Sequence, residues 1–245
     1  MPRILTYNVH RCVGVDRRLD VGRVAAVIAA EAPDIVVLQE VDVGRARTGG
    51  VDQAHRLAQR LGMSHRFNAA LTVEEELYGD AILTALPERL IKAGPLPGYA
   101  RIPQLEPRGA LWVAIEIGGG VELQVINTHL GLVPKEQQLQ AAALAGPAWL
   151  GSEARRDPLM LVGDFNATSA TVAYRTLARR LKDAHALCRR RGRIATFPSS
   201  MPVLRIDHVF VSAGLRVLAM ATPADPLARL ASDHLPLTVD FEVVA

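Results

Sequence analysis

Short apolar runs that end in polar side chains recur along this chain. Residues 159–162 (LMLV) form such a run and predict a buried strand, which leads into GDFN at residues 163–166. Residues 3–7, 35–38 and 81–84 predict further strands of the same kind. A polar side chain at the end of a buried strand lies at the edge of a sheet, where it is available for chemistry.

Capped segments between the strands predict helices. A strand, a helix and a second strand follow one another over residues 3–38, and this order implies a crossover connection. The crossover brings Asn8 and Glu40 to the same end of one sheet. The predicted helices cover residues 21–30 with Asp20 as N-cap, residues 52–61 before Gly62, residues from Pro134 towards Gly146, and residues 170–181.

The second half of the chain predicts pairs of strands. Three glycines at residues 118–120 turn residues 111–117 back into residues 121–126 as a hairpin, whose second arm ends in His129. Alternation predicts a strand over residues 205–211, and the chain closes with a strand over residues 237–243. We interpret residues 42–51 as a loop, and the three glutamates at 74–76 as a solvated charge run outside any site.

Composition narrows the class of protein. The chain has 245 residues without a linker-like segment, so we expect one α/β domain over residues 1–245. No apolar stretch reaches the length of a membrane span, no signal peptide is visible, and the two cysteines lack zinc-site spacing. These features predict a cytoplasmic protein; the sequence leaves its oligomeric state open.

Charge is mildly positive and suits an anionic partner. The net charge is +3, and arginines cluster at residues 179–180 and 189–193 without interleaved aromatic residues. We favour a solvated basic face over a nucleic-acid groove for these clusters. A phospholipid headgroup is a third possibility, which would place the protein at the membrane periphery.

The GDFN segment offers the first candidate chemistry. On an extended backbone Asp164 and Asn166 point to the same side, and they present a carboxylate and an amide suited to a metal-bound water or a phosphate. An Asx turn that ends the strand is the competing interpretation. The choice between these interpretations depends on the other polar strand ends. Together with Asp164 and Asn166 they make a set of eight candidate site residues, the others being Asn8, Glu40, His129, Asp207, Asp233 and His234.

Over essentially the whole chain these residues resemble the endonuclease/exonuclease/phosphatase family of DNase I-like, metal-dependent hydrolases. The resemblance implies a four-layer α/β/β/α sandwich of two mainly antiparallel sheets flanked by helices, with the active site at one edge. The matching segments, in order, are TYNVH, LQEV, YGDAILT, NTHL, GDFN, IDHVFVS and SDHLP.

The resemblance also implies roles for individual residues. Glu40 and Asn8 match the metal-side pair, with Asp233 on the metal side or beside His234. His129 matches the phosphate-binding position, Asp164 and Asn166 the pair that activates water and orients substrate, and Asp207 the partner of His234. Arg108 falls where relatives often carry a basic residue near the phosphate, and Asp80 stands where several relatives have Asn.

Hard oxygen ligands at these positions suit Mg²⁺ or Mn²⁺. We expect a phosphodiesterase or phosphatase acting on a small or lipid-linked phosphoester, with either Asp164 or His234 as the general base. The alternative is a DNA or RNA nuclease. A non-catalytic binding module on the same fold is disfavoured because Glu40, Asp164 and His234 are all present.

Overall fold

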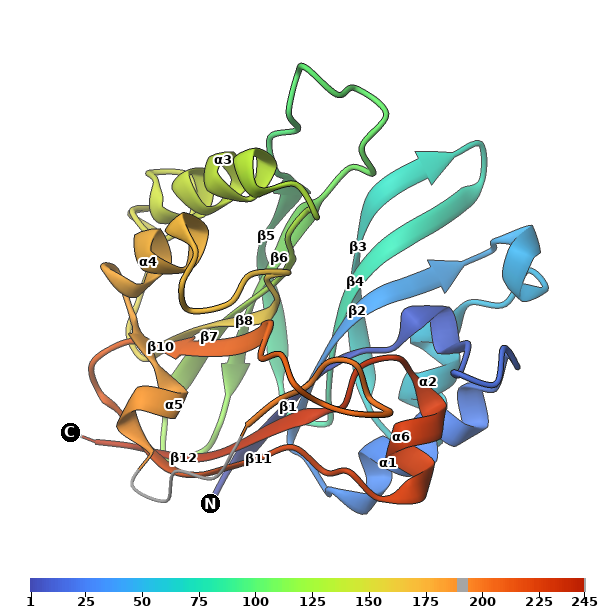
Figure 1. Cartoon of the computed structure of the whole chain (residues 1–245). Helices are drawn as coiled ribbons and strands as arrows, with labels where there is room; N and C mark the ends of the chain where they lie inside the picture. Colours follow the sequence, from blue (N-terminus) through green and yellow to red (C-terminus); the bar gives the residue numbers. More distant parts are fainter. Residues whose placement is uncertain (189–193, 245) are drawn as a thin grey trace.

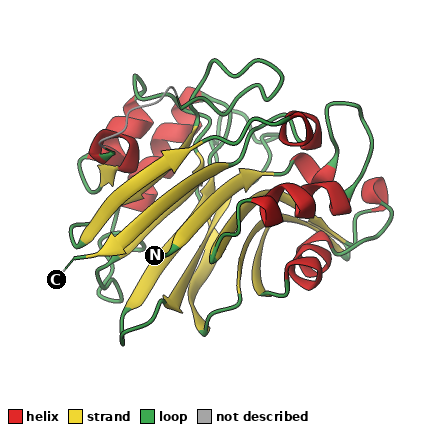
Figure 2. Ribbon diagram, turned by 90° about the horizontal axis from the view of Figure 1, so that it is seen from below, coloured by secondary structure: helices red, strands yellow, loops and turns green. Residues whose placement is uncertain are grey.

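The computed structural model describes residues 1–188 and 194–244, which fold into two β-sheets packed face to face (Figure 1). Helices cover the outer sides of both sheets, as the view from below also shows (Figure 2). The predicted α/β/β/α arrangement is therefore confirmed. The arginine run at residues 189–193, which we interpreted as part of a basic face, lies outside the described residues. No helix in the described ranges combines the length and apolar character needed to cross a membrane.

Each sheet is mixed, with one parallel pair of strands near its middle and antiparallel pairs elsewhere. The parallel pairs are β1 with β2 and β7 with β8. The first sheet has the order β11 (Leu215–Ala221), β12 (Leu237–Val243), β1 (Arg3–Asn8), β2 (Ile35–Val43), β4 (Glu76–Thr84), β3 (Ser64–Val73). The second has the order β5 (Glu88–Pro95), β6 (Gly109–Glu116), β7 (Glu122–His129), β8 (Leu159–Asp164), β10 (Asp207–Val211), β9 (Lys182–Asp183).

The inner faces of the sheets meet in an apolar core. Ile4 and Val37 of the first sheet belong to one buried cluster with Val113 and Val125 of the second. Burying an aliphatic side chain of this size stabilises a fold by roughly 1.5–3 kcal/mol. Central strands are covered by the other sheet on one face and by helices on the other, so their sequences are almost continuously apolar.

Two further apolar clusters join the helices to the sheets. On the first sheet, Val24, Leu57 and Ala228 come from three helices and pack on β1, β2 and β4. On the second, Leu144 and Leu177 pack on β6 to β8. The helices are α1 (Val21–Ala30), α2 (Gln53–Leu61), α3 (Pro134–Ala145), α4 (Val172–Ala178), α5 (Ala184–Leu187) and α6 (Pro226–Ala231), with short 3₁₀ turns η1 (His10–Cys12) and η2 (Ala46–Thr48).

Local signals placed α1, α2 and α3 correctly, whereas the short helices α5 and α6 were not predicted. The Asp20 side chain accepts a hydrogen bond from the Arg23 amide at 2.9 Å and caps α1 as predicted. Asp52 caps α2 in the same way, and Gly62 ends it in the left-handed conformation. The helix that begins at Pro134 is also confirmed.

Several predicted boundaries were wrong; the strand predicted over residues 81–84, for example, already begins at Glu76. The predicted loop at residues 42–51 contains the end of β2 at Val43 and the turn η2. The helix predicted over residues 170–181 is shorter, because the Thr171 hydroxyl caps its start and Ala178 is its last residue. The strand predicted over residues 205–211 begins only at Asp207, where pairing with β8 starts.

Candidate active site

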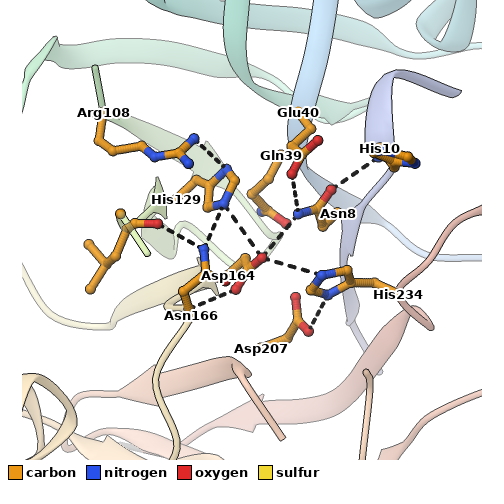
Figure 3. A network of polar contacts seen from close by, with 12 residues as sticks. Asn8, His10, Gln39, Glu40, Arg108, His129, Asp164, Asn166, Asp207 and His234 are labelled. Atoms are coloured by element: carbon orange, nitrogen blue, oxygen red, sulfur yellow. Dashed lines mark hydrogen bonds and ion pairs between the residues drawn. The ribbon is translucent and has the colours of Figure 1, made fainter. Parts of the chain in front are cut away.

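Polar residues from both sheets meet in one network (Figure 3). Asn8 pairs with Gln39 in the parallel register of β1 and β2, and His129 pairs with Asp164 in that of β7 and β8. Because parallel strands end at the same edge, these side chains converge. The antiparallel strand β10 starts at this edge, where Asp207 pairs with Asp164.

Glu40 reaches the site through a β-bulge. The pairing of β2 with β4 shifts register between Leu38 and Val41, and Glu40 adopts a φ of +58° within this shift. Asn127 of the other sheet donates hydrogen bonds to the carbonyls of Leu38 at 2.8 Å and Ala81 at 2.9 Å, the last pair before the shift. A side-chain amide from the second sheet therefore supports the irregular backbone that presents Glu40.

The Asp164 carboxylate is the hub of the network. Its Oδ2 accepts a hydrogen bond from Asn8 Nδ2 at 3.0 Å and lies 3.6 Å from Nε2 of both His129 and His234. Burial and the nearby charge of Asp207 raise the pKa of Asp164 to about 7, against the opposing effect of His234. A carboxyl group with a pKa near neutrality can both take up and release a proton.

Asn166 is positioned by a turn rather than by a continuing strand. β8 ends at Asp164, whose Oδ1 accepts a hydrogen bond from the Asn166 amide at 2.8 Å, and Asn166 has a φ of +48°. The expectation of an extended backbone here was wrong, because this Asx turn closes the strand. The turn nevertheless leaves Asn166 and Asp164 in one network. Gly163 is required before them, since a side chain there would collide with the Thr128 carbonyl.

His129 lies between two hydrogen-bond donors. Arg108 Nη1 is 3.2 Å from its Nδ1, and Asn166 Nδ2 is 3.0 Å from its Nε2. Burial and the charge of Arg108 lower the pKa of His129 well below its ordinary value, which favours the neutral ring. A neutral imidazole has a single acceptor nitrogen, so it can satisfy only one of the two donors.

His234 is held as a cation. Its Nδ1 lies 2.9 Å from Asp207 Oδ2, and its Nε2 faces Asp164. Burial works against the charged ring, but the carboxylates of Asp207 and Asp164 outweigh it and raise the pKa of His234 to about 10. His234 therefore carries a proton at neutral pH and directs an N–H into the site.

The carboxylates separate into two groups. Asp164 and Asp207 have oxygen atoms within 4.8 Å of each other and of a His234 nitrogen. Because the Asp207–His234 pair holds a proton, we regard this group as a proton-transfer group and not as a metal site. Glu40 lies beside it, with Oε1 accepting from Asn8 Nδ2 at 3.1 Å, and Asp233 lies at the rim, with Oδ1 4.0 Å from His10 Nδ1.

A pocket of about 500 Å³ opens above this network. It is lined by Glu40, His129, Asp164 and other predicted residues. It is also lined by residues that the sequence reasoning did not single out: His10, Arg11, Arg47, Tyr78, Glu106, Leu132, Phe197, Leu204 and Ile206. His10 and Arg11 directly follow the first polar strand end, and that position could have drawn attention to them. The others come from loops and strands whose approach to the site depends on the tertiary fold.

Asp80, whose role the resemblance left open, is fully enclosed on β4. Burial raises its pKa to about 8, against the opposing charge of Arg108, and its Oδ2 has no hydrogen-bond partner among the described residues. A protonated Asp80 presents an O–H donor, much as an asparagine presents an N–H.

Comparisons with known proteins agree with this architecture. A sequence model described as "Endonuclease/Exonuclease/phosphatase family" matches residues 5–234. The protein YbhP of Escherichia coli K12, described as uncharacterized, is 27% identical over 98% of this chain and 96% of its own length.

Solved structures show the same fold. The endonuclease/exonuclease/phosphatase of Beutenbergia cavernae is 25% identical and has a TM-score of 0.77, with 99% of this chain and 71% of that chain covered. A protein of Bacteroides thetaiotaomicron described as a mannosyl-6-phosphatase is 20% identical and has a TM-score of 0.79, with 99% and 100% covered.

Proposed function

This chain belongs to the endonuclease/exonuclease/phosphatase family, and we propose that it hydrolyses small phosphoesters with the help of a divalent cation. Members of the family act on phosphoester bonds. One observation supports the proposal most strongly. Asp164 lies within 3.6 Å of two histidines of opposite protonation, one neutral and one cationic, at the floor of an open pocket.

The side of the site around the neutral His129 ring suits a phosphate group. Arg108 and Asn166 both direct N–H groups at His129, which can accept from only one of them. A phosphate oxygen would supply the missing acceptor, and the positive charge of Arg108 favours an anion there. Arg108, Asn166 and His129 therefore form the proposed phosphate cradle.

The acidic side of the site suits proton transfer. Asp164 in its charged form would take a proton from the attacking water, while the water oxygen bonds to phosphorus and the bond from phosphorus to the leaving oxygen breaks. The protonated His234, held by Asp207, would donate a hydrogen bond to the charge that builds on the phosphoryl group. Of the two candidate bases, we favour Asp164, because His234 already holds its proton.

The oxygen ligands fit a hard cation such as Mg²⁺ or Mn²⁺. Glu40 and Asp233 place carboxylates on the pocket wall, and the Asn8 amide links Glu40 to Asp164. We propose that Glu40 is the main ligand, assisted by Asn8 and Asp233. When bound, the cation would neutralise phosphate charge and stabilise the leaving oxygen.

The pocket favours a small substrate over a nucleic acid. Its volume of about 500 Å³ is in the range of small-molecule sites. The net charge of +3 offers few contacts for a chain of phosphates. Cleavage of DNA or RNA remains the alternative. The comparisons above do not support a phospholipid headgroup as substrate; the activity printed for the Bacteroides thetaiotaomicron protein is that of a mannosyl-6-phosphatase. We therefore do not propose a lipid-linked substrate.

A substrate panel tests this function. Purified protein with Mg²⁺ should release phosphate from p-nitrophenyl phosphate or sugar phosphates, or cleave bis(p-nitrophenyl) phosphate, and leave supercoiled plasmid intact. Asp164→Asn should lower kcat by about a hundredfold or more, as expected when a general base is lost. Glu153→Gln changes an exposed carboxylate outside the pocket and is the matched control. Plasmid nicking without turnover of small esters would replace this proposal with the nuclease alternative.

A further inference from the structure

Arg11 lines the pocket but neither takes part in the reaction proposed above nor pairs with a carboxylate among the described residues. The guanidinium of Arg47 donates to Asp42 at 2.8 and 2.7 Å, and that of Arg108 to Glu106 at 2.7 Å, so each of these two arginines already has a carboxylate partner. In the described part of the chain, no carboxylate pairs with Arg11, although it lines the same pocket. Its charge is therefore available to a ligand.

The contacts of Arg11 are few and uncharged. Its Nη2 lies 2.6 Å from His10 Nε2, and the opposite ring nitrogen of His10 lies 3.0 Å from the Val13 carbonyl. Both contacts fit one tautomer, with hydrogen on Nδ1, so that Nε2 accepts from the guanidinium. The Nε of Arg11 is buried without a hydrogen-bond partner among the described residues.

The backbone holds Arg11 in this position at an energetic cost. His10, Arg11 and Cys12 have φ values of +45°, +56° and +56°, in the left-handed region that residues with side chains avoid. The fully buried Gln53 donates from Nε2 to the Arg11 carbonyl at 2.7 Å and so secures the turn from α2. Strain that the surroundings maintain is frequent at binding sites, because it presents a side chain that a relaxed turn would direct elsewhere.

This turn lies apart from the phosphate cradle. Figure 3 shows His10 on one side of the polar network and Arg108 on the other, with Asp164 between them. Because Arg11 contacts His10, its guanidinium belongs to the side away from Arg108. The pocket therefore presents cationic groups at two separate places.

We propose that Arg11 forms a second anion subsite and that the substrate is a small molecule with a second phosphate group. The inference rests on the proposed function, in which Arg108, His129 and Asn166 hold the phosphate that is cleaved. Arginine suits the second phosphate because its planar N–H groups match phosphate oxygens in pairs. Phe197 and Leu204 also line the pocket and offer apolar contact to a carbon skeleton.

Matched pairs of compounds test the subsite. Phosphate release would be measured for fructose 6-phosphate against fructose 1,6-bisphosphate, 3-phosphoglycerate against 2,3-bisphosphoglycerate, and adenosine 3′-monophosphate against adenosine 3′,5′-bisphosphate. In at least one pair the bisphosphate should have a kcat/KM about tenfold higher or more, the effect expected from one charge-assisted hydrogen-bonded contact.

Variants of Arg11 test whether this residue causes the preference for a bisphosphate. Arg11→Gln keeps a donor near His10 but removes the charge, and it should lower the bisphosphate-to-monophosphate ratio by about tenfold or more. Arg11→Lys should retain most of the ratio. Arg18→Gln removes an exposed charge from the same segment outside the pocket and should leave the ratio unchanged. Thermal melting checks that each variant is folded.

The outcomes separate the two proposals. Phosphate release without a preference for any bisphosphate, or a preference that survives Arg11→Gln, would overturn the second subsite and leave the proposed function intact. No phosphate release from any of these compounds would overturn the second subsite, and the proposed function itself would be overturned only if bis(p-nitrophenyl) phosphate were also left intact. A preference that is lost in Arg11→Gln and kept in Arg11→Lys would support the subsite.

Discussion

At the scale of single residues, a structural role and a chemical role coincide at GDFN. The Asp164 side chain uses Oδ1 to close an Asx turn and leaves Oδ2 to face both histidines. The two interpretations of this tetrapeptide from sequence were therefore compatible, because a carboxylate has two oxygens. Sequence alone could not show this, because the contacts of the second oxygen depend on where His129 and His234 lie in the fold.

The charge on His234 gives a prediction about pH. The pKa of this histidine is raised from an ordinary 6.5 to about 10, so the folded state binds the proton more tightly than the unfolded state. The resulting stabilisation is complete below pH 6.5 and is lost as the pH rises through about 10. Unfolding by urea in EDTA should therefore show a lower free energy of unfolding at about pH 10 than at about pH 8.5.

Asp207→Asn is the matching variant for this experiment. It removes the carboxylate that holds the imidazolium, so it should flatten the dependence of stability on pH in this window. Asp164 and Asp80, with raised pKa values of about 7 and about 8, change the free energy of unfolding mainly at pH values below this window. Equal slopes in wild type and variant would refute the assignment of the proton to His234.

At the scale of elements, an irregular strand is held by the opposite sheet. Beside the bulge that presents Glu40, Asn127 donates to two buried carbonyls, those of Leu38 and Ala81. Asn127 in turn accepts a hydrogen bond from Gln39 Nε2 at 2.9 Å. The buried amides thereby connect the two sheets directly beneath the proposed metal site.

Replacing Asn127 should affect both stability and metal binding. Asn127→Leu removes the donors to two buried carbonyls, and leaving a buried polar group unpaired costs roughly 1–3 kcal/mol each. We expect the free energy of unfolding to fall by about 2 kcal/mol or more, with weaker Mn²⁺ binding measured by calorimetry. Asn127→Asp retains the shape but replaces the donors by oxygens and should act in the same direction. Wild-type values in both measurements would show that Asn127 does not support Glu40.

The sequence predicted central elements better than peripheral ones. Strands covered on both faces, such as β8, have continuous apolar sequences, the N-cap Asp20 marked the start of α1, and Gly62 marked the end of α2. β3 and β5 lie at sheet edges and are half exposed, so their composition does not differ from that of loops. The positive φ of Glu40 could not be predicted either, because its support comes from a residue 87 positions away in the second sheet.

At the scale of the whole molecule, the site depends on the packing of two sheets. Asn8 and Glu40 belong to the first sheet, and His129 and Asp164 to the second. Sequence order and the resemblance predicted which residues assemble. They could not supply the protonation states, which follow from burial and mutual distance, nor the pocket residues contributed by loops.

Metal binding should stabilise the folded molecule as a whole. Because a cation would bind only where these carboxylates are assembled, excess Mn²⁺ should raise Tm by about 5 °C or more over protein in EDTA. Glu40→Gln should remove most of this shift, since it removes the main proposed ligand. Glu106→Gln alters a pocket carboxylate that pairs with Arg108, and it should keep the shift. An equal shift in all three proteins would place the cation elsewhere.

The most direct test of the central claim follows the oxygen of the attacking water. Hydrolysis of a small phosphoester by wild-type protein with Mg²⁺ in H₂¹⁸O should give phosphate that carries one ¹⁸O and an alcohol that carries none, because the water activated by Asp164 attacks phosphorus. Asp164→Asn should form this product at about one hundredth of the wild-type rate or below. Label in the alcohol, or labelled phosphate formed at the wild-type rate by Asp164→Asn, would contradict the account.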